Sequence, residues 1–420
     1  MKNENNIFKP ADILIPRGCD MEKWAVIACD QFTSEPEYWD EAAKTAGDAP
    51  SALNLILPEV RLGGDISGYI ADINGSMEKY LNEGIFAEYR DSFIYVERTL
   101  MDGKIRRGIV GMLDLEEYAY IKGSGSRIRP TERTVPERIP PRKDIRKNAL
   151  LELPHILVLC DDEEDLVLGS VDKEGAQCLY DFDLMLGGGN VKGWLIDGKA
   201  AEKVNEKFAE YSEKKEAEYN AAGISPLILA VGDGNHSLAT AKVCWEELKN
   251  SDPEKDWSDH PARYVMVEIE NIRDDAQEFE PIYRIVKRTN TRALVEAIHK
   301  SGIVDKNAAD DASTLVTWYA GDEKGTFNLK LKKGQLPIDR LQAFLDDYLE
   351  YNHGVIDYIH GVDSVKKLSE KPGVIGFVLP EFDKNMLFNE IAYVGVCPRK
   401  TFSIGHAREK RYYIEARKIR

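Results

Sequence analysis

Short apolar runs separated by polar turns alternate along this chain with longer segments of helical periodicity. The runs FKPADILIP at residues 8–16 and WAVIACDQF at 24–32 predict two short strands. Residues 93–115 predict a β-hairpin, because Asp102 and Gly103 form a favoured two-residue turn between two arms rich in strand-forming residues. This alternation of strands and helices predicts an α/β fold of the mixed α+β kind.

Residues 199–222 predict an amphipathic helix that faces solvent on one side. Lys and Glu alternate along it, and its apolar positions share one face at i, i+4 and i+7: Val204, Phe208 and Tyr211. Gly223 favours the end of this helix. The apolar run 226–231 then predicts a strand, and a second helix follows whose apolar residues repeat with a period of 3.6: Leu238, Ala241, Trp245 and Leu248.

The length of 420 residues is too great for one small domain and indicates two or three. Residues 123–142 are rich first in Gly and Ser and then in Pro, so we expect neither regular helix nor strand there, but a functional loop or a domain boundary. We expect three regions: an N-terminal mixed α/β region at 1–118, a central core at 119–275, and a C-terminal α+β region with a basic tail at 276–420. Residues 315–331 in the last region predict a second hairpin.

The composition is typical of a soluble globular protein, with 43% hydrophobic and 31% charged residues. No apolar run approaches the roughly 18 residues that a membrane span requires. The N-terminal sequence lacks the apolar stretch of a secretory signal. Six scattered cysteines form no CxxC pair, which favours buried free thiols. We therefore expect a cytoplasmic protein without a membrane partner.

The net charge of −17 argues against nucleic-acid binding, because most of this surface would repel a polyanion. Two segments are nevertheless basic. Residues 126–147 carry eight Lys and Arg against three acids, and the last 22 residues, from Arg399, carry eight against two. These two basic segments could meet around an anion of modest size, or could be solvated loop and tail charge.

The most informative short stretch is Gly232 to Ser237, where the strand at 226–231 stops and the next helix begins. The first turn of a helix exposes unpaired N–H groups and the positive end of the helix dipole, which together favour a phosphate. Asp233 could hold a metal ion or a sugar hydroxyl, and His236 and Ser237 could donate hydrogen bonds to phosphate oxygens. The alternative is an ordinary tight turn, with Asn235 or Ser237 as the N-cap.

This stretch, read from Val231 to Ser237 as VGDGNHS, resembles the ADGHHR signature of a bacterial and archaeal family of unknown function, domain of unknown function 1015. That family is similar to the archaeal free-serine kinases of the ParB/sulfiredoxin-like superfamily. Three further blocks resemble family motifs in the same order along the chain: Pro130–Thr134, Pro281–Arg284 and Pro398–Thr401. The resemblance therefore extends over nearly the whole chain.

The resemblance implies a ParB/serine-kinase-like central core that uses ATP or ADP, with Mg²⁺, to phosphorylate a small hydroxyl compound such as an amino acid. It implies Glu132, Asp233 and His236 as catalytic residues, with Glu132 as general base and Asp233 also as metal ligand. A carboxylate base suits this chemistry, because a hydroxyl attacks poorly until its proton is removed. The nucleotide-binding positions that the resemblance and the turn together suggest are Gly232, Gly234, Asn235, Ser237, Arg133, Thr134, Arg284, Arg399, Lys400 and Thr401.

The chain departs from the family pattern at four positions. Ser237 replaces an arginine, Asn235 and Thr131 each replace a histidine, and Tyr283 replaces the histidine of the third motif. The loss of an arginine that would hold phosphate leaves a second hypothesis open: a regulatory protein that binds a nucleotide or phosphate without catalysis.

A third hypothesis is a haloacid-dehalogenase-type phosphatase. GDGNHS resembles the GDGxND metal loop of that group, and DFDLM resembles its DxDxT motif, with Asp181 as nucleophile. Ser237 stands where that group has its second Asp, and Met185 stands where it has Thr, so the match is incomplete.

Overall fold

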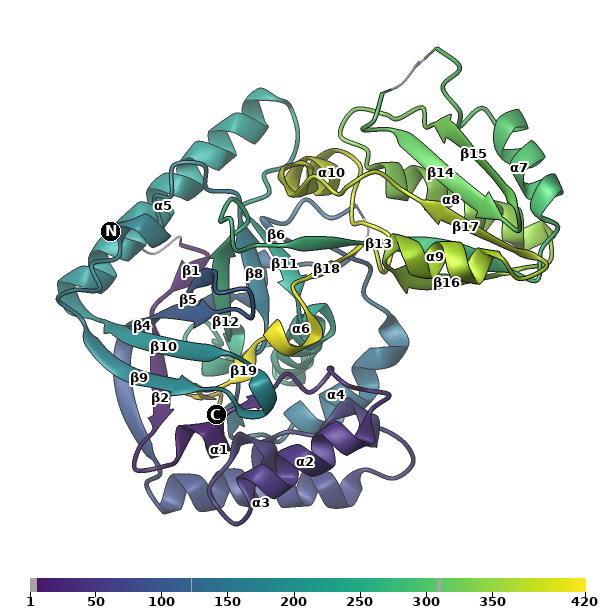
Figure 1. The fold of residues 1–420 in the computed structure, drawn as a ribbon. Coiled ribbons are helices and arrows are strands. Elements are labelled where there is room, and N and C mark those ends of the chain that lie inside the picture. Colours follow the sequence, from purple (N-terminus) through teal and green to yellow (C-terminus); the bar gives the residue numbers. More distant parts are fainter. Residues whose placement is uncertain (1–5, 122, 308–310) are drawn as a thin grey trace. The chain divides into compact units, whose positions relative to one another are not determined.

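The computed structural model describes residues 6–121, 123–307 and 311–420 (Figure 1). These residues form two compact units: the first comprises residues 6–121, 123–130, 134–277 and 405–420, and the second comprises 131–133, 278–307 and 311–404. Residues 1–5, at the start of the first expected region, lie outside the described residues. The expected boundary at 275/276 lies next to the division after Gln277, whereas the one at 118/119 falls inside the first unit.

The first unit is built on one ten-stranded sheet whose main path runs β6-β11-β8-β12-β5-β4-β10-β9, with β1 paired to β5 and β2 to β4. The strands of the whole first unit, including those outside this sheet, are β1 Phe8–Lys9, β2 Ala11–Pro16, β3 Val26–Ile27, β4 Phe86–Thr99, β5 Ile105–Asp114, β6 Ile128–Pro130, β7 Leu151–Glu152, β8 Leu157–Cys160, β9 Gln177–Asp183, β10 Asn190–Ile196, β11 Leu229–Asp233, β12 Tyr264–Asn271, β19 Tyr412–Tyr413 and β20 Arg417–Lys418. Its helices are α1 Met21–Trp24, α2 Pro36–Ala46, α3 Ser67–Asn82, α4 Ile139–Arg146, α5 Gly198–Ala221 and α6 Asn235–Ser251.

Hydrophobic cores lie on both faces of this sheet. Alternate residues of a strand point to opposite faces, and in β4 Ile94 belongs to one core cluster while its neighbours Phe93 and Tyr95 belong to the other. Helices α2 and α3 pack on the first face, and α5 and α6 pack on the second (Figure 1). The sheet is therefore the central layer of the unit, which confirms the mixed α/β fold class.

Several predicted elements are confirmed. The hairpin at 93–115 is the antiparallel pair β4–β5, and the amphipathic helix at 199–222 is α5, which ends before Gly223 at φ +72°. All six cysteines are free thiols, as expected, but only Cys160 and Cys397 are buried, and Cys178 is exposed. No helix in the described parts of the chain is long and apolar enough to cross a membrane.

The expectation of irregular structure throughout residues 123–142 is wrong. Residues 128–130 form β6, which pairs in parallel with β11, and α4 begins at Ile139. Pro140 and Pro141 lie in the first turn of α4, where the N–H that proline lacks has no partner within the helix. A proline-rich segment is therefore compatible with a helix start.

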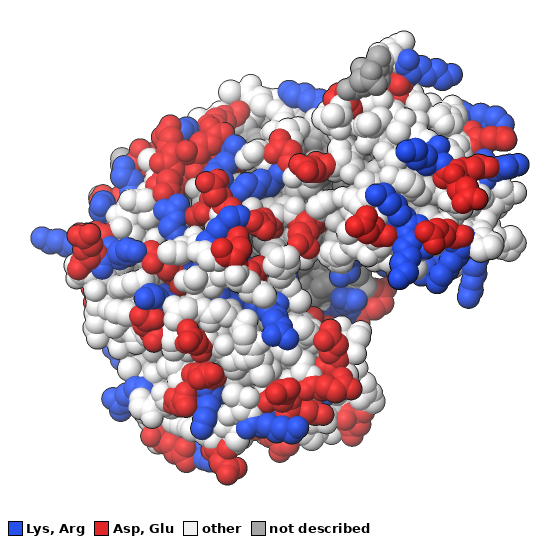
Figure 2. All heavy atoms as spheres, viewed as in Figure 1, with Lys and Arg blue, Asp and Glu red and all other residues white. Residues whose placement is uncertain are grey.

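The C-terminal tail, residues 405–420, is part of the first unit. Its strand β19 pairs with β3, and β20 pairs with β7. The tail carries charged side chains into the interior: Arg411 and Glu415 are 3% and 0% exposed. Acidic and basic side chains are interspersed over the face shown in Figure 2.

The second unit contains a six-stranded sheet with the main order β15-β14-β17-β13-β16 and with β18 paired to β13. Its strands are β13 Phe279–Lys287, β14 Leu315–Ala320, β15 Glu323–Asn328, β16 Val355–His360, β17 Val374–Val378 and β18 Phe402–Ile404. Its helices are α7 Thr291–Lys300, α8 Pro337–Tyr351, α9 Val362–Ser369 and α10 Leu387–Tyr393. The predicted hairpin at 315–331 is the antiparallel pair β14–β15.

The second unit contains a buried acid whose protonation should control its stability. Glu390 on α10 is 0% exposed, and its Oε2 accepts the backbone N–H of Leu336 at 2.5 Å. Burial, together with the nearby Asp339 carboxylate, raises the pKa of Glu390 to about 8. Because the folded pKa lies above the ordinary 4.5, the protonated acid stabilises the fold below that value, and this contribution is lost as pH rises through about 8.

We therefore expect Glu390→Gln to match the stability of the wild type near pH 5 and to exceed it by about 1–3 kcal/mol near pH 9. Urea unfolding at the two pH values measures the difference. Glu350→Gln, an exposed position on α8, is the matched control and should unfold like the wild type at both. A Glu390→Gln advantage of equal size at both pH values would contradict this assignment.

Candidate phosphate site at the start of helix α6

The turn between β11 and α6 has the strand–glycine–helix form predicted from the sequence. Gly234 adopts the left-handed conformation at φ +77° and ψ +22°, and its carbonyl accepts the N–H groups of Ser237 and Leu238 at 3.0 Å. A Cβ atom at this position would lie 3.0 Å from Ile156 Cα. Gly232 lies where the β11–β8 register shifts. Glycine at 234 is therefore required both by conformation and by the close approach of Ile156, just before β8.

Asp233, the last residue of β11, is held by two donors of the protein. Its Oδ1 accepts the Gly234 N–H at 2.8 Å, and its Oδ2 lies 3.3 Å from Lys410 Nζ on the C-terminal tail. Burial raises the pKa of Asp233, but Lys410 and the Gly234 N–H outweigh it and hold the pKa below its ordinary value. A metal ion at Asp233 would have to compete with Lys410. No group of three or more metal-ligand side chains occurs among the residues that the structure describes.

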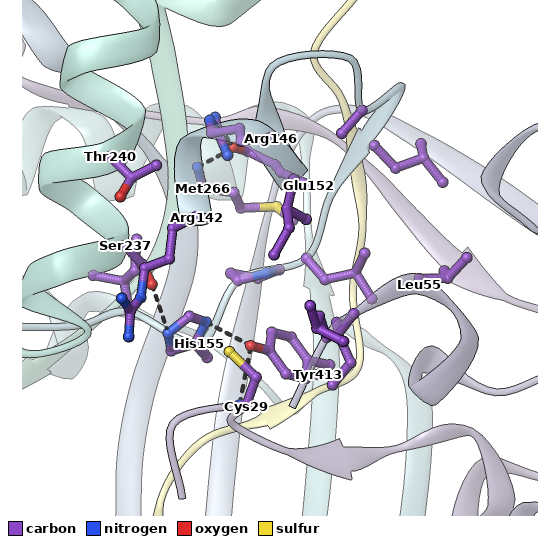
Figure 3. A pocket seen from close by; sticks show the side chains of 18 of the residues that line it. Cys29, Leu55, Arg142, Arg146, Glu152, His155, Ser237, Thr240, Met266 and Tyr413 are labelled. Atoms are coloured by element: carbon purple, nitrogen blue, oxygen red, sulfur yellow. Dashed lines mark hydrogen bonds and ion pairs between the residues drawn. The ribbon is translucent and has the colours of Figure 1, made fainter. Parts of the chain in front are cut away.

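Ser237 begins a line of hydrogen-bonded side chains. Its Oγ lies 3.0 Å from His155 Nε2, and His155 Nδ1 lies 2.9 Å from Tyr413 Oη. The backbone N–H of Cys29 donates to Tyr413 Oη at 3.2 Å. Figure 3 shows this line running from α6 through His155 to the tail.

The line borders a cavity of about 140 Å³. This volume is comparable to engineered cavities that hold a benzene ring. The walls are mostly apolar. Ser237, His155 and Arg142 lie together at one corner of the cavity, whereas Arg146 and Glu152 lie together at another side (Figure 3). Arg142, on α4, pairs with Glu59. The corner thus combines a guanidinium group with the positive end of α6.

One ring nitrogen of His236 accepts a hydrogen bond from the protein and cannot donate one to a ligand. Its Nε2 accepts the backbone N–H of Val135 at 3.2 Å. Burial, with smaller effects of Arg142 and Arg138, lowers the pKa of His236 to about 4, so the ring is neutral at pH 7. Only Nδ1 then carries a proton that could be donated to a phosphate.

The second unit assembles another group of the predicted residues. Thr401 N–H donates to Glu132 Oε1 at 3.2 Å, and Lys400, at φ +59°, forms the turn that presents this amide. Desolvation raises the pKa of Glu132, although the Lys400 and Thr401 amides oppose it. Arg284 is completely buried and donates to the carbonyl groups of residues 282, 399 and 400.

The predicted site residues therefore divide between the units. The first unit contains Gly232, Asp233, Gly234, Asn235, His236, Ser237 and Thr134. The second contains Glu132, Arg133, Arg284, Arg399, Lys400 and Thr401. The catalytic and binding roles predicted for these residues stay predictions.

Sequence reasoning missed four residues near the turn: His155, Arg142, Lys410 and Tyr413. Arg142 and Lys410 belong to the two basic segments, which the charge distribution had already indicated as possible anion-binding regions. His155 and Tyr413 carried no signal, because a lone histidine in an apolar strand and a tyrosine in a basic tail are common.

The phosphatase hypothesis fails on topology. Asp181 lies on β9 and pairs with Lys192 at 2.9 Å, whereas Asp233 ends β11. The two strands are six positions apart in the sheet order, about 29 Å at the usual spacing of about 4.8 Å per strand. A nucleophile and its metal ligand could not act together across that distance.

Comparison with known proteins gives no match to a curated protein. A conserved hypothetical protein from Pyrococcus furiosus is similar in structure, with a TM-score of 0.33, 13% identity, and coverage of 69% of this chain and 90% of the other. A free serine kinase in complex with AMP gives a TM-score of 0.38, 13% identity, and coverage of 72% and 92%. SbnI from Staphylococcus aureus gives 0.35, 9%, and coverage of 68% and 82%. Residues 14–348 match the family described as "Protein of unknown function (DUF1015)", and the chain belongs to that family.

Proposed function

We propose that this protein binds a nucleotide, ATP or ADP, at the start of α6 and transfers a phosphoryl group to a small hydroxyl compound. The observation that carries this proposal is the polar corner of the cavity, where the first turn of α6, Ser237 and Arg142 converge beside apolar walls. Backbone N–H groups at a helix start and a guanidinium group are the usual protein partners of phosphate.

The cavity has room for only part of a nucleotide, such as one flat ring or one phosphoryl group. Its apolar walls, which include Leu57, Met77 and Val265, offer contact to a flat base, and its polar corner offers contact to phosphate oxygens. Mg²⁺ commonly binds through phosphates and only one or two carboxylates, so it would arrive with the nucleotide.

The family resemblance makes Glu132, in the second unit, the candidate general base. Its raised pKa places proton uptake closer to neutral pH, where a base of this kind works best. The Thr401 amide fixes one carboxylate oxygen, which favours a defined orientation.

A non-catalytic nucleotide-binding protein is the second candidate. It is favoured by Lys410, which already pairs with the carboxylate of Asp233 that a metal ion would use. Turnover separates the two functions. Nucleotide binding without phosphorylation of any amino acid or sugar alcohol would favour the regulatory protein.

The phosphate subsite can be tested on α4. Arg142→Gln removes the guanidinium group at the cavity corner and should weaken ATP and ADP binding about 10- to 100-fold, as expected for the loss of one or two charge-assisted hydrogen bonds. Isothermal titration with Mg²⁺ measures this affinity. AMP, which lacks the outer phosphates, should be the nucleotide least affected.

Lys143→Gln is the matched control. It removes the same charge from the next residue of α4, but Lys143 pairs with Glu247 at 2.8 Å and does not line the cavity. Its affinity for ATP should equal that of the wild type. Equal weakening in both variants would show a general charge effect and would contradict the proposed subsite.

A further inference from the structure

The line Ser237–His155–Tyr413 has the geometry of an activated nucleophile. A hydroxyl within 2.6–3.2 Å of a base that is oriented by a third group is the common signature of nucleophilic catalysis. Here the hydroxyl–imidazole distance is 3.0 Å and the imidazole–phenol distance is 2.9 Å. The three residues come from α6, from the segment before β8, and from β19, so that tertiary packing alone brings them together.

His155 is equipped to accept a proton. It is 7% exposed, and burial lowers its pKa despite the opposing effects of the Asp30 and Asp233 carboxylates, so the imidazole is neutral at pH 7. When its proton is on Nδ1, His155 donates to Tyr413 Oη and leaves Nε2 to accept the Ser237 proton. Tyr413 is 2% exposed, with its ring 5.2 Å from that of His155, and it therefore fixes the imidazole orientation.

Ser237 stands where an incoming phosphoryl group would be stabilised. It is the third residue of α6, close to the positive helix end, and it lines the cavity together with Arg142. Negative charge that develops on a phosphoryl group during attack would face the Arg142 guanidinium and the positive end of the α6 dipole. A serine whose role was only to bind His155 would need neither feature.

We propose that Ser237 is a covalent nucleophile: it first receives the phosphoryl group, which is then transferred to the acceptor. This inference rests on the proposed phosphotransfer function and adds a phosphoserine intermediate to it. Ser237 Oγ bonds to the terminal phosphorus of the nucleotide, and its proton moves to His155 Nε2. The bond from that phosphorus to the bridging oxygen breaks, and the leaving nucleotide keeps the electron pair.

The second half of the cycle reverses the roles. The acceptor hydroxyl releases its proton to a water molecule as its oxygen attacks the phosphorus of the phosphoserine, the Oγ–phosphorus bond breaks with its electron pair on Oγ, and His155 returns its proton to Ser237 Oγ. Atoms and charges balance without any oxidant or further reactant. Tyr413 acts as a positioning residue, because it touches His155 and not the reacting atoms.

The first experiment incubates the full chain with ATP and Mg²⁺ without an acceptor. Mass spectrometry should find up to one phosphoryl group per chain, on the peptide that contains Ser237, with an equal burst of ADP. Ser237→Ala should show neither. His155→Gln should slow phosphorylation about 10²- to 10⁴-fold, the usual contribution of a general base.

Ser251→Ala is the matched control. Ser251 lies at the other end of α6, where its hydroxyl donates to Leu248 O at 2.7 Å, and this variant should be phosphorylated like the wild type.

A second experiment needs no nucleotide: an alkyl fluorophosphonate should label Ser237, and the rate of labelling should fall in His155→Gln. In Tyr413→Phe the pH profile of labelling should shift, which loss of packing alone would not cause. The charged groups that act on the pKa of His155, and therefore on this pH profile, are Asp30, Asp233, Arg142 and Arg411.

The outcomes separate this inference from the proposed function. If ATP binds and is turned over while Ser237 is neither phosphorylated nor labelled, the covalent step is overturned and the proposed function stands. If Ser237 is labelled by the fluorophosphonate but never phosphorylated by bound ATP, the phosphoryl intermediate is overturned as well. If the wild type binds no nucleotide, the proposed function fails, and this inference fails with it.

Discussion

Arg411→Met is expected to lower the free energy of unfolding of the first unit by about 3–5 kcal/mol, the usual loss when one partner of a buried charge cluster is removed. Arg411 is 3% exposed, with Nε 2.6 Å from Glu268 and a terminal nitrogen 2.7 Å from Glu415. Burial alone would lower its pKa, but Glu415 and Glu268 outweigh burial and raise it. Methionine fills similar space and leaves two buried carboxylates without their cation.

Denaturant unfolding measures this loss. Hydrogen exchange at β3, which pairs with β19 next to Arg411, should localise it.

Lys418→Met is the matched control on the same tail. Lys418 pairs with Glu88 at 3.2 Å, but both side chains are substantially exposed, and such pairs contribute about 0–1 kcal/mol. A loss in Arg411→Met no larger than that in Lys418→Met would contradict the role assigned to the buried cluster. The same tail supplies Lys410 to Asp233 and Tyr413 to His155, so a stable tail is also a condition for an intact site.

The fold could be predicted from the sequence wherever one local signal decided the structure. The β4–β5 hairpin follows from Asp102 and Gly103, and α5 follows from the spacing of Val204, Phe208 and Tyr211. Residues 128–130 were missed because β6 forms only when β11, about a hundred residues later, provides its partner. The local composition of residues 128–130 does not predict a pairing with such a distant segment.

The candidate site was predictable in part for the same reason. The turn at Gly234 could be predicted from the sequence, because a left-handed residue between a strand and a helix favours glycine. The line through His155 and Tyr413 joins residues 258 positions apart, and neither residue type is unusual where it stands. Glu132 and Thr401 meet across 269 positions, and only the family resemblance had marked both.

The unit boundaries could not be foreseen either. Residues 131–133 belong to the second unit, because Thr131 O accepts the Cys397 N–H at 2.8 Å and Glu132 pairs with Cys397 as an isolated bridge. Three residues thus leave the first unit and return to it. A division by composition, which placed the whole stretch in a central core, has no means to detect an excursion of this length.

A buried arginine organises the turn that holds Glu132. Arg284 donates to the carbonyl groups of residues 399 and 400, at 3.2 and 2.7 Å, and to Gln342 Oε1 at 2.8 Å. Its guanidinium lies 5.0 Å from the centre of the Tyr358 ring. The family resemblance had placed Arg284 among the residues that bind the nucleotide, whereas these contacts show that its donors are engaged by the protein. That binding role stays a prediction.

Arg284→Lys is expected to lower the stability of the second unit by about 2–4 kcal/mol, because an ammonium group cannot replace a planar fork that serves several acceptors at once. Lysine keeps the charge, so the expected loss reports geometry. Hydrogen exchange should rise at β13 and in residues 399–401, and the Thr401 amide that binds Glu132 should lose protection. Arg399→Lys is the matched control, because exposed Arg399 contacts the same Tyr358, with Nε 3.2 Å from its hydroxyl, and should cost less than about 1 kcal/mol. Equal losses in the two variants would show that burial of Arg284 does not set the strength of this turn.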